Sequence, residues 1–524
     1  MKKLSAKKKR WIERTVVNDR SYKRFLYNRF YAYILAVFLQ LIGYAVLLFL
    51  FAYKSDYAPI VQIVVVALEI VFVLIIISDN ERPSTKLSWA IVILIFPLFG
   101  VPMYLVNGRG RPTKKMAKRL SKSVGDNAVS ENAFYGERRA LGKGTVSAYL
   151  DQASNYPPLK GDISYYKTGE EAFPELLKGL ESAEKYIFLE YFIIAHGKMW
   201  QAILKTLLKK AIEGVKVYII YDDFGCMKTL PPDYERYLES LHENIKCMTF
   251  NNVVPIFAVR MNNRDHRKIT VVDGKIAFTG GYNLADEYIG EKIRFGHWKD
   301  SGVKITGDAV YPFARIFCNT WNAFRKDKID LQQFLPALTG EGNAECIQPY
   351  DDSPLDHLSV GETVYLDIIN RAQKYVYIFT PYLILDDFMR TALCLAAARG
   401  VDVRIVTPGI PDKKAIYRLT RANYGILLKA GVRIYEYTPG FIHSKSMISD
   451  DERAVVGTIN LDYRSLYHHF ENAVYFKDER AIADLKKDCE DTFMVSRERT
   501  KENTKRGVFG RLFDTILRVF ETLM

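Results

Sequence analysis

A short pattern of reactive residues occurs twice in this chain with the same internal spacing. The first copy is His266-x-Lys268, then Asp273, then Gly280-Gly281-x-Asn283. The second copy is His443-x-Lys445, then Asp450, then Gly457-Thr458-x-Asn460. Chance does not produce two such matches in one chain of ordinary composition. The repeat therefore predicts a fold with two similar halves.

Each copy of the pattern has the features of a β-hairpin. Alternate residues of a strand face the same side, so the histidine and the lysine of one copy should point together. Apolar segments follow at 269–272 and 446–449, and turn signals follow these at 273–274 and 450–451. A second apolar strand comes next, and its end should bring the asparagine to the same face.

The residue types of the two hairpins suit chemistry on a phosphate. One imidazole can attack phosphorus while the other protonates the leaving oxygen. Lysine and asparagine side chains can stabilise charge on the non-bridging oxygens. Asp273 and Asp450 lie beyond the strand, seven positions after each histidine, and their spacing favours a role in fixing the turn over contact with substrate.

Similarity between the two parts of the chain extends beyond the motifs. Residues 183–188 match 372–377, and residues 213–218 match 399–404, with helical stretches at 199–212 and 388–398. Strands that alternate with helices predict the α/β class. We expect two halves, 146–335 and 336–500, each a mixed sheet flanked by helices and related to the other by a pseudo-twofold axis.

Charge and cysteine content limit the function classes. The chain has 524 residues, a net charge of +14 and six cysteines without a C-x-x-C pair. This cysteine pattern favours a reducing compartment and argues against disulfides or a zinc site. The pair His468-His469 is the nearest metal-ligand candidate and is set aside, so neither a metal nor a cofactor is expected. The positive charge suits nucleic acid or an anionic membrane.

The N-terminal part favours the membrane. A basic tail at 1–30 with eleven Lys or Arg precedes apolar segments at 33–52, 60–78 and 89–106, and a basic linker at 108–145 follows. The first two segments are long enough to cross a bilayer, whereas Pro97 and Pro102 break the third. Basic flanks on both sides predict two crossings, with the catalytic halves in the cytoplasm. Three crossings with an external catalytic part remain the alternative.

The C-terminal segment 501–524 predicts an amphipathic helix. Apolar residues recur there at helical spacing, and charged residues lie on the opposite face. Such a helix belongs either to the core or to the membrane interface.

The two motifs resemble the paired HKD motifs of the phospholipase D superfamily, whose members use a phosphohistidine intermediate and no metal. The resemblance implies catalytic roles for His266, Lys268, Asp273, His443, Lys445 and Asp450. It implies phosphate binding by Asn283, Asn460 and Thr458. It also implies an acid that orients each histidine, Asp300 for the first copy and Glu471 for the second. Gly281 departs from the family, which often has serine there.

A narrower resemblance, to bacterial cardiolipin synthases, covers about residues 60–500. It is carried by Asn460-Leu461-Asp462-x-Arg464-Ser465, by Leu189-Glu190-Tyr191-Phe192 and by the region from Pro83 to Gly100. It implies an integral, multi-pass protein of the bacterial cell membrane that makes cardiolipin and glycerol from two phosphatidylglycerol molecules through a phosphatidyl-histidine. The family analogy favours His266 as the nucleophile.

The resemblance implies phosphatidylglycerol and anionic membrane lipids as partners, with no nucleic acid, and allows a homo-oligomer. Water as acceptor would instead make a phospholipase D, and serine a phosphatidylserine synthase. A non-catalytic membrane scaffold is the alternative from a different class, but the two intact motifs argue against it.

Overall fold

The computed structural model describes a few positions between 38 and 49, then residues 58–108, 114–135, 144–253, 262–334, 340, 342–344, 346–355, 358–502, 507–519 and 521–523. The expected basic tail 1–30 and most of the first apolar segment 33–52 lie outside these described residues.

The first half contains a seven-stranded mixed sheet. Its order is β1 (Asp162–Tyr166), β8 (Gly302–Thr306), β6 (Ile276–Gly280), β5 (Lys268–Val272), β2 (Tyr186–Tyr191), β3 (Lys216–Asp222) and β4 (Ile245–Phe250). Strands β2, β3 and β4 are parallel, and the other neighbours are antiparallel.

The second half contains an eight-stranded sheet that repeats this order. It runs β9 (Cys346–Asp352), β16 (Glu471–Lys477), β15 (Arg453–Gly457), β14 (Ser446–Ser449), β10 (Tyr375–Phe379), β11 (Asp402–Pro408) and β12 (Arg433–Tyr437), and β17 (Ser496–Arg499) adds an edge. Strands β10, β11 and β12 are again the parallel ones. The expectation of two α/β halves with mixed sheets is confirmed.

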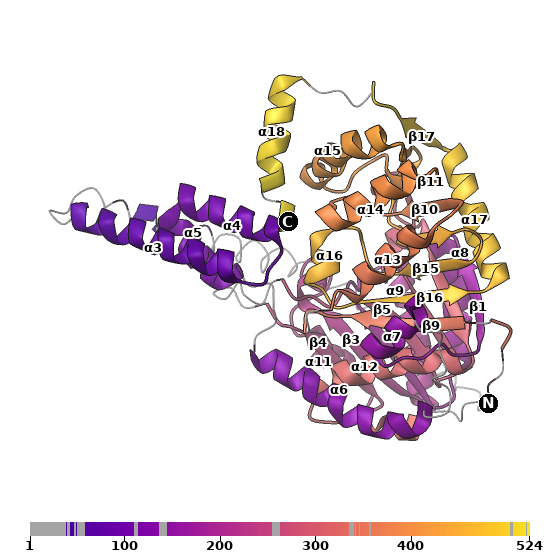
Figure 1. Ribbon diagram of the computed structural model, residues 1–524. Helices are drawn as coiled ribbons and strands as arrows, with labels where there is room; N and C mark the ends of the chain where they lie inside the picture. The colour runs from indigo at the N-terminus through magenta and orange to yellow at the C-terminus, as the bar shows by residue number, and fades with distance from the viewer. Residues whose placement is uncertain are drawn as a thin grey trace.

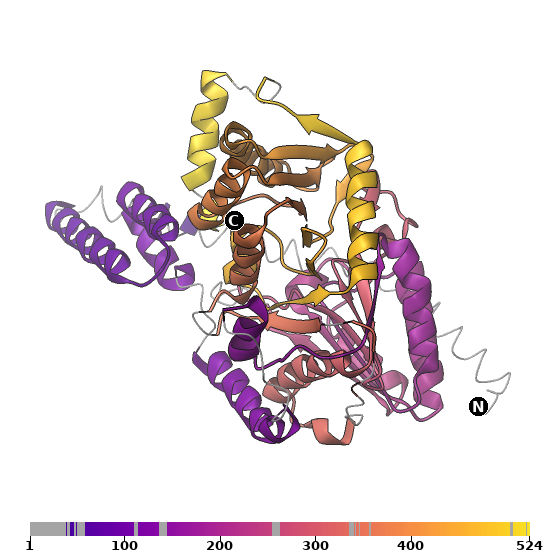
Figure 2. The same ribbon diagram turned by 45° about the vertical axis from the view of Figure 1, so that its right-hand side comes forward.

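Helices cover the outer face of each sheet (Figures 1 and 2). In the first half these are α8 (Gly169–Ser182), α9 (Lys198–Ile212) and α11 (Tyr234–Leu241), and in the second α13 (Val360–Arg371), α14 (Asp387–Ala398) and α15 (Lys414–Ala430). Helices α12 (Tyr311–Phe324) and α17 (Glu479–Met494) join the inner sheet faces in one apolar core. This shared core holds the two halves together.

Local sequence signals account for the main elements. Thr168 and Asp386 cap the N-termini of α8 and α14 by accepting backbone N–H groups. The predicted hairpins are β5–β6 and β14–β15, and Asp273 and Asp450 adopt φ values of +52° and +59° at their turns. Aspartate is one of the few side chains that tolerate this left-handed conformation, which explains its place in both motifs.

The N-terminal helices project from the catalytic halves (Figure 1). Segment 60–78 forms most of α3 (Ala58–Ser78), and the third apolar segment contributes to α4 (Pro83–Ile95) and α5 (Pro97–Asn107). The expected break falls at Pro97, whereas Pro102 lies inside α5. Across the described part of the chain, no helix combines the length and apolar character needed to cross a membrane. Membrane-spanning helices are therefore not confirmed.

A junction around Arg82 ties these helices to the second half. Its guanidinium pairs with Glu362 and lies 2.6 Å from an Asp386 oxygen. The same group stacks 3.7 Å from the ring centre of Tyr467, at the end of α16 (Tyr463–Tyr467). The 80–83 turn is thereby fixed against the helix that leads to Glu471.

The expected basic linker is largely helical, as α6 (Lys114–Tyr135), and contacts α12. The expected C-terminal helix is α18 (Val508–Val519). Its Asp514 faces inward to Arg418 at 2.7 Å, while Phe509 is 88% exposed. The apolar face of α18 is thus partly uncovered.

The remaining elements are α7 (Val146–Ser154), α10 (Asp223–Cys226), β7 (His297–Lys299), β13 (Gly440–Ile442), and 3-10 turns at Asp286–Ile289, Asp308–Val310, Leu331–Phe334 and Glu521–Leu523.

Candidate active site

The two motifs meet where backbone from one half pairs with backbone from the other. Strand β7 of the first half runs parallel to β13 of the second, just before His443. An isolated bridge joins Asp265, just before His266, to Phe470 of the second half. Both histidines are therefore held by chain from the opposite half.

The orienting acids are exchanged between the halves. His266 Nδ1 lies 2.9 Å from both carboxylate oxygens of Glu471, and His443 Nδ1 lies 2.6 Å from Asp300 Oδ2. The sequence correctly singled out both acids, but the expected pairing of Asp300 with the first copy and Glu471 with the second was wrong. Each acid contacts the histidine of the other half.

Backbone hydrogen bonds explain the exchange. His266 N–H donates to the Phe470 carbonyl at 2.8 Å, so the next residue, Glu471, faces this histidine. His443 N–H donates to the Lys299 carbonyl at 2.7 Å, which brings Asp300 to the other histidine. Reciprocal contacts of this kind are the signature of a twofold relation between the halves.

The His266 pair is supported by further polar groups. Burial lowers the pKa of His266 to about 3, although the Glu471 charge opposes this shift. Burial alone would raise the pKa of Glu471, but the charge and hydrogen bonds of His266, together with the nearby His469, keep that pKa below its ordinary value. The Thr458 hydroxyl also donates to Glu471. Glu471 is accordingly an anion, placed to accept a hydrogen bond from an Nδ1–H of His266.

The His443 pair has a different electrostatic setting. Burial raises the pKa of Asp300 to about 7, against the opposing charges of Lys445 and Lys268. Burial and then these two lysines lower the pKa of His443 well below its ordinary value. Lys445 Nζ lies 2.8 Å from His443 Nδ1. His443 is therefore neutral, with donors at its Nδ1.

The motif lysines are buried at the same place. Burial lowers the pKa of Lys268 to about 7 and that of Lys445 to about 8. The charge of Lys445 further lowers the pKa of Lys268. The charge of Lys268 in turn lowers the pKa of His443, which belongs to the other half. Two cationic groups thus flank the space between the histidines.

The motif aspartates contact backbone rather than the histidines. Asp273 accepts the N–H groups of residues 184–186 at 2.7–2.8 Å, and Asp450 accepts those of residues 373–375 at 2.8–2.9 Å. Their placement among the catalytic groups is therefore corrected. Each aspartate ties its hairpin turn to the strand beside it, as the spacing favoured.

The side chains expected to bind phosphate also have protein contacts. Asn283 Nδ2 donates to the Tyr288 hydroxyl at 2.7 Å, and Asn460 Nδ2 donates to Ser465 Oγ at 3.0 Å. An amide nitrogen carries two hydrogens, so each asparagine keeps a second donor. Thr458 differs, because its hydroxyl donates to Glu471 and accepts the Asn472 N–H. Its contacts are with the orienting acid rather than with a phosphate.

Gly281 occupies the position equivalent to Thr458. A Cβ atom on Gly281 would lie 2.0 Å from Asp300 Oδ1. The glycine therefore leaves room for the Asp300 carboxylate to reach His443. The missing hydroxyl is replaced in part by the Ser301 N–H, which donates to Asp300 at 2.9 Å.

Sequence reasoning missed several supporting residues. Arg267, between the motif histidine and lysine, is buried and bonds Thr320 at 2.9 Å and Asp351 of the second half at 3.2 Å. Asn472 accepts the Lys268 N–H and donates to Thr279, which joins β16 to the first half. The only signal for Asn472 was its place directly after Glu471.

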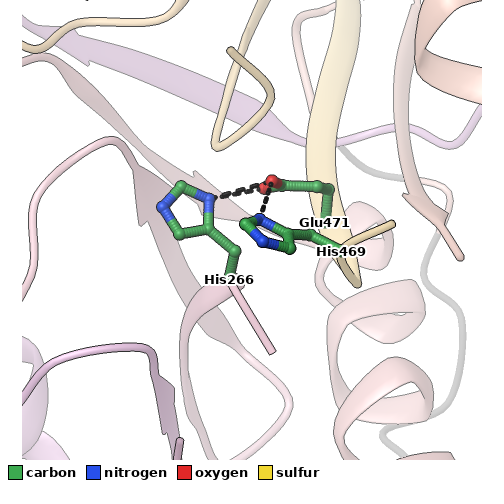
Figure 3. A group of neighbouring side chains, drawn as sticks. All are labelled: His266, His469 and Glu471. Carbon is green, nitrogen blue, oxygen red and sulfur yellow. Dashed lines mark hydrogen bonds and ion pairs between the residues drawn. The ribbon is translucent and has the colours of Figure 1, made fainter. Parts of the chain in front are cut away.

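His469 was also missed, having been set aside with His468. Its ring lies 5.5 Å from that of His266, and its Nδ1 lies 3.6 Å from Glu471 Oε1 (Figure 3). Among the described residues, these three side chains form one group with the composition and spacing of metal ligands. The sequence did not indicate this grouping, because His266 lies about 200 positions from the other two residues.

Comparisons with known proteins agree with this architecture. The family model described as cardiolipin synthase, PLD-like domain, matches residues 176–313 and 365–493, and a phospholipase D-nuclease N-terminal model matches 66–109. A cardiolipin synthase of Staphylococcus aureus is 32% identical over 472 residues, covering 87% of this chain and 95% of its own length. One of Alkalihalophilus pseudofirmus is 32% identical over 482 residues, covering 88% and 93%.

Two further matches are consistent with these. An uncharacterised protein of Streptococcus mutans is 42% identical over 467 residues, covering 86% of this chain and 99% of its own. The crystal structure of phosphatidylserine synthase from Haemophilus influenzae matches with a TM-score of 0.56 at 14% identity, covering 73% of this chain and all of that one, which shows the shared fold alone. The chain therefore belongs to the cardiolipin synthases of the phospholipase D superfamily and is a phosphatidyltransferase of that type.

Proposed function

We propose that this enzyme makes cardiolipin and glycerol from two molecules of phosphatidylglycerol, through a phosphatidyl-histidine intermediate. The observation that carries the proposal is the crossed pairing of His266 with Glu471 and of His443 with Asp300. Both imidazoles are held at Nδ1 by an acid from the opposite half. Each therefore has its Nε2 directed away from that acid and available for chemistry at one phosphorus.

The different settings of the pairs assign their roles. Because Glu471 is an anion, it holds the proton on His266 Nδ1 and leaves a lone pair on Nε2, which is the state of a nucleophile. His443 Nδ1 faces Lys445 and an Asp300 carboxyl whose pKa is raised to about 7. This setting favours a proton on His443 Nε2, and His443 can act as a general acid because the Asp300 proton can move to Nδ1 as the Nε2 proton leaves.

The first step then transfers a phosphatidyl group to the enzyme. His266 Nε2 attacks the phosphorus of one phosphatidylglycerol, and the bond from phosphorus to the glycerol oxygen breaks. His443 Nε2–H protonates that oxygen while the Asp300 carboxyl passes its proton to His443 Nδ1, so glycerol leaves as a neutral alcohol and His443 stays a neutral imidazole. Lys268, Lys445 and the second amide hydrogens of Asn283 and Asn460 stabilise charge on the non-bridging oxygens.

The second step reverses the proton movement. The terminal hydroxyl of a second phosphatidylglycerol gives its proton to His443 Nε2 and attacks the phosphorus, while the phosphorus–nitrogen bond to His266 breaks. Aromatic rings surround this space, since Trp298, Phe441 and Tyr288 lie 5.6–5.8 Å from the His443 ring. Such a lining disfavours water as the acceptor.

The enzyme works, in this proposal, at the bacterial cell membrane as a multi-pass protein with its catalytic halves on the cytoplasmic side. The support is exposed apolar surface: Ile63, Leu74 and Ile77 of α3 are 60–70% exposed, and Val508, Phe509, Leu512 and Phe513 of α18 are 49–88% exposed. Cysteines placed beside the active site should resist labelling from outside intact cells. Ready labelling there would refute the orientation.

Purified full-length protein incubated with phosphatidylglycerol vesicles tests the reaction. Lipid separation should show cardiolipin, with glycerol released in equal amount and undiminished in excess chelator. Phosphatidic acid alone would mean hydrolysis, and a serine-dependent product would mean phosphatidylserine synthesis. His266→Ala and His443→Ala should each abolish transfer, whereas the control His242→Ala should not. Full turnover in either active-site variant would refute the mechanism.

The intermediate distinguishes the two histidines. With phosphate-labelled phosphatidylglycerol and rapid acid-free quenching, His443→Ala should retain label on the protein, because His266 can still attack phosphorus while the base that activates the acceptor hydroxyl is missing. His266→Ala should carry none. The reverse pattern would exchange the two roles.

A further inference from the structure

The group formed by His266, His469 and Glu471 has no assigned purpose beyond the contact of His266 with its acid. His469 lies at the entrance of β16, two residues before Glu471, and its side chain is only 11% exposed. Neither of its ring nitrogens has a hydrogen-bond partner among the described residues. A nearly buried imidazole in this state has unused capacity to bind a ligand.

The spacing of the three side chains fits a zinc ion. His266 Nδ1 and His469 Nδ1 lie 2.9 and 3.6 Å from Glu471 oxygens, and one ligand atom from each residue falls within 4.8 Å of the others. Bonds of about 2.0–2.1 Å in tetrahedral geometry separate ligand atoms by roughly 3.3–3.4 Å. The two separations from Glu471 bracket this value, and the two histidine ligand atoms lie within 4.8 Å of each other (Figure 3).

The other half supplies an internal comparison. Trp298 stands two residues before Asp300, as His469 stands before Glu471, and its ring lies 5.6 Å from His443. An indole N–H only donates and cannot bind a metal ion. The His443 pair therefore offers two ligands, whereas the His266 pair offers three.

We propose that His266, Glu471 and His469 form an inhibitory site for a divalent zinc ion. The ion occupies His266 Nδ1 in place of its proton. The neutral imidazole then carries its proton on Nε2, where the attacking lone pair is otherwise held. Zinc thus stops catalysis by fixing the tautomer that cannot attack phosphorus. The inhibitory effect rests on the proposed function, whereas the binding does not.

Calorimetric titration of the full-length protein in detergent with zinc chloride tests the site directly. The wild type should bind one zinc ion at this site. His469→Asn should weaken that binding at least tenfold, and so should His469→Trp, which copies the other half. The matched control is His297→Asn, since His297 has one nearby carboxylate, Glu170 at 3.7 Å, and is 40% exposed. It should bind zinc as the wild type does. Equal affinity in the His469 variants, or no zinc binding by the wild type, overturns the proposal.

Phosphatidyl transfer provides the second measurement, with each variant compared with its own zinc-free rate. Zinc should inhibit the wild type and the His297 control reversibly, with recovery in chelator. His469→Asn should need at least tenfold more zinc. Undiminished transfer by zinc-saturated wild type overturns the tautomer argument. A zinc-free wild type that forms no cardiolipin refutes the proposed function instead, and leaves the calorimetric result standing.

Discussion

Substitution of Gly281 separates two views of the active site. The equivalent residue in the second half is Thr458, whose hydroxyl supports Glu471. Symmetry alone would predict that Gly281→Ser supplies a missing donor to Asp300 and improves the enzyme. The packing predicts the opposite, because any Cβ at this position would lie 2.0 Å from Asp300 Oδ1.

The size of the effect follows from this distance. Ordinary contact begins at 3.4 Å, so the Asp300 carboxylate must retreat by about 1.4 Å, which breaks its 2.6 Å contact with His443. A displacement of about 1 Å at a catalytic group can cost roughly 100-fold in rate. We expect kcat to fall about 100-fold in both Gly281→Ala and Gly281→Ser.

Stability should respond differently from rate. The group that must move is the end of a side chain, and Gly281 has no positive φ, so alanine fits the backbone. A compatible Gly-to-Ala change stabilises a protein by about 0.4–1 kcal/mol through the unfolded chain, which offsets part of the steric cost. The thermal unfolding midpoint should therefore stay close to that of the wild type.

Steady-state formation of cardiolipin from phosphatidylglycerol in mixed micelles measures the effect on kcat. Gly425→Ala is the matched control, because a Cβ there meets no atom within 4 Å. It should keep wild-type kcat. If Gly281→Ser retains half of the wild-type kcat or more, Asp300 does not depend on the space that the glycine leaves, and the reasoning fails.

Three other properties can be tested. As pH rises from about 7 to about 8, kcat/KM should fall, because Lys268 and Lys445 lose their charges and Asp300 loses the proton that supports His443; Lys445→Arg, which stays charged, should lose the upper part of this fall, and an unchanged profile would exclude Lys445 as a source of that part. Asp273→Asn should lower the free energy of unfolding by about 1–3 kcal/mol, because it weakens three backbone contacts; kcat per folded molecule should be retained, and a selective loss of kcat would restore a catalytic role. Arg82→Gln should lower the unfolding free energy by about 1–3 kcal/mol, because Glu362 and Asp386 lose a shared cation; chemical denaturation measures both changes, and unaltered stability would mean that the junction does not stabilise the fold.

Much of the fold could be predicted from the sequence because its signals are local. Period-two alternation and the turn residues at 273 and 450 determine two hairpins, and their repetition determines two halves. The exchange of the acids could not be predicted in this way. It depends on the backbone pairing of Phe470 with the first half and of Lys299 with the second, and spacing along one chain carries no information about such long-range contacts.

The same limit applies to side chains whose neighbours come from elsewhere. Gly281 was recognised as a departure from the family, but its consequence depends on the approach of Asp300. His469 was set aside because a histidine pair in sequence is a weak signal. Its proximity to His266 arises only when the two halves meet.

Two of the differences between the copies lie around the acids rather than at the reacting groups. Glu471 is adjacent to the Thr458 hydroxyl and the His469 imidazole, whereas the equivalent positions around Asp300 hold Gly281 and Trp298. Polar neighbours favour an ionised carboxylate, and apolar ones favour a protonated carboxyl. An ionised acid fixes the proton on Nδ1 of its histidine, while a protonated acid donates to Nδ1 and moves the proton to Nε2. In the proposed mechanism, two motifs with the same histidine and lysine act as nucleophile and general acid because the halves differ in the residues around the exchanged acids.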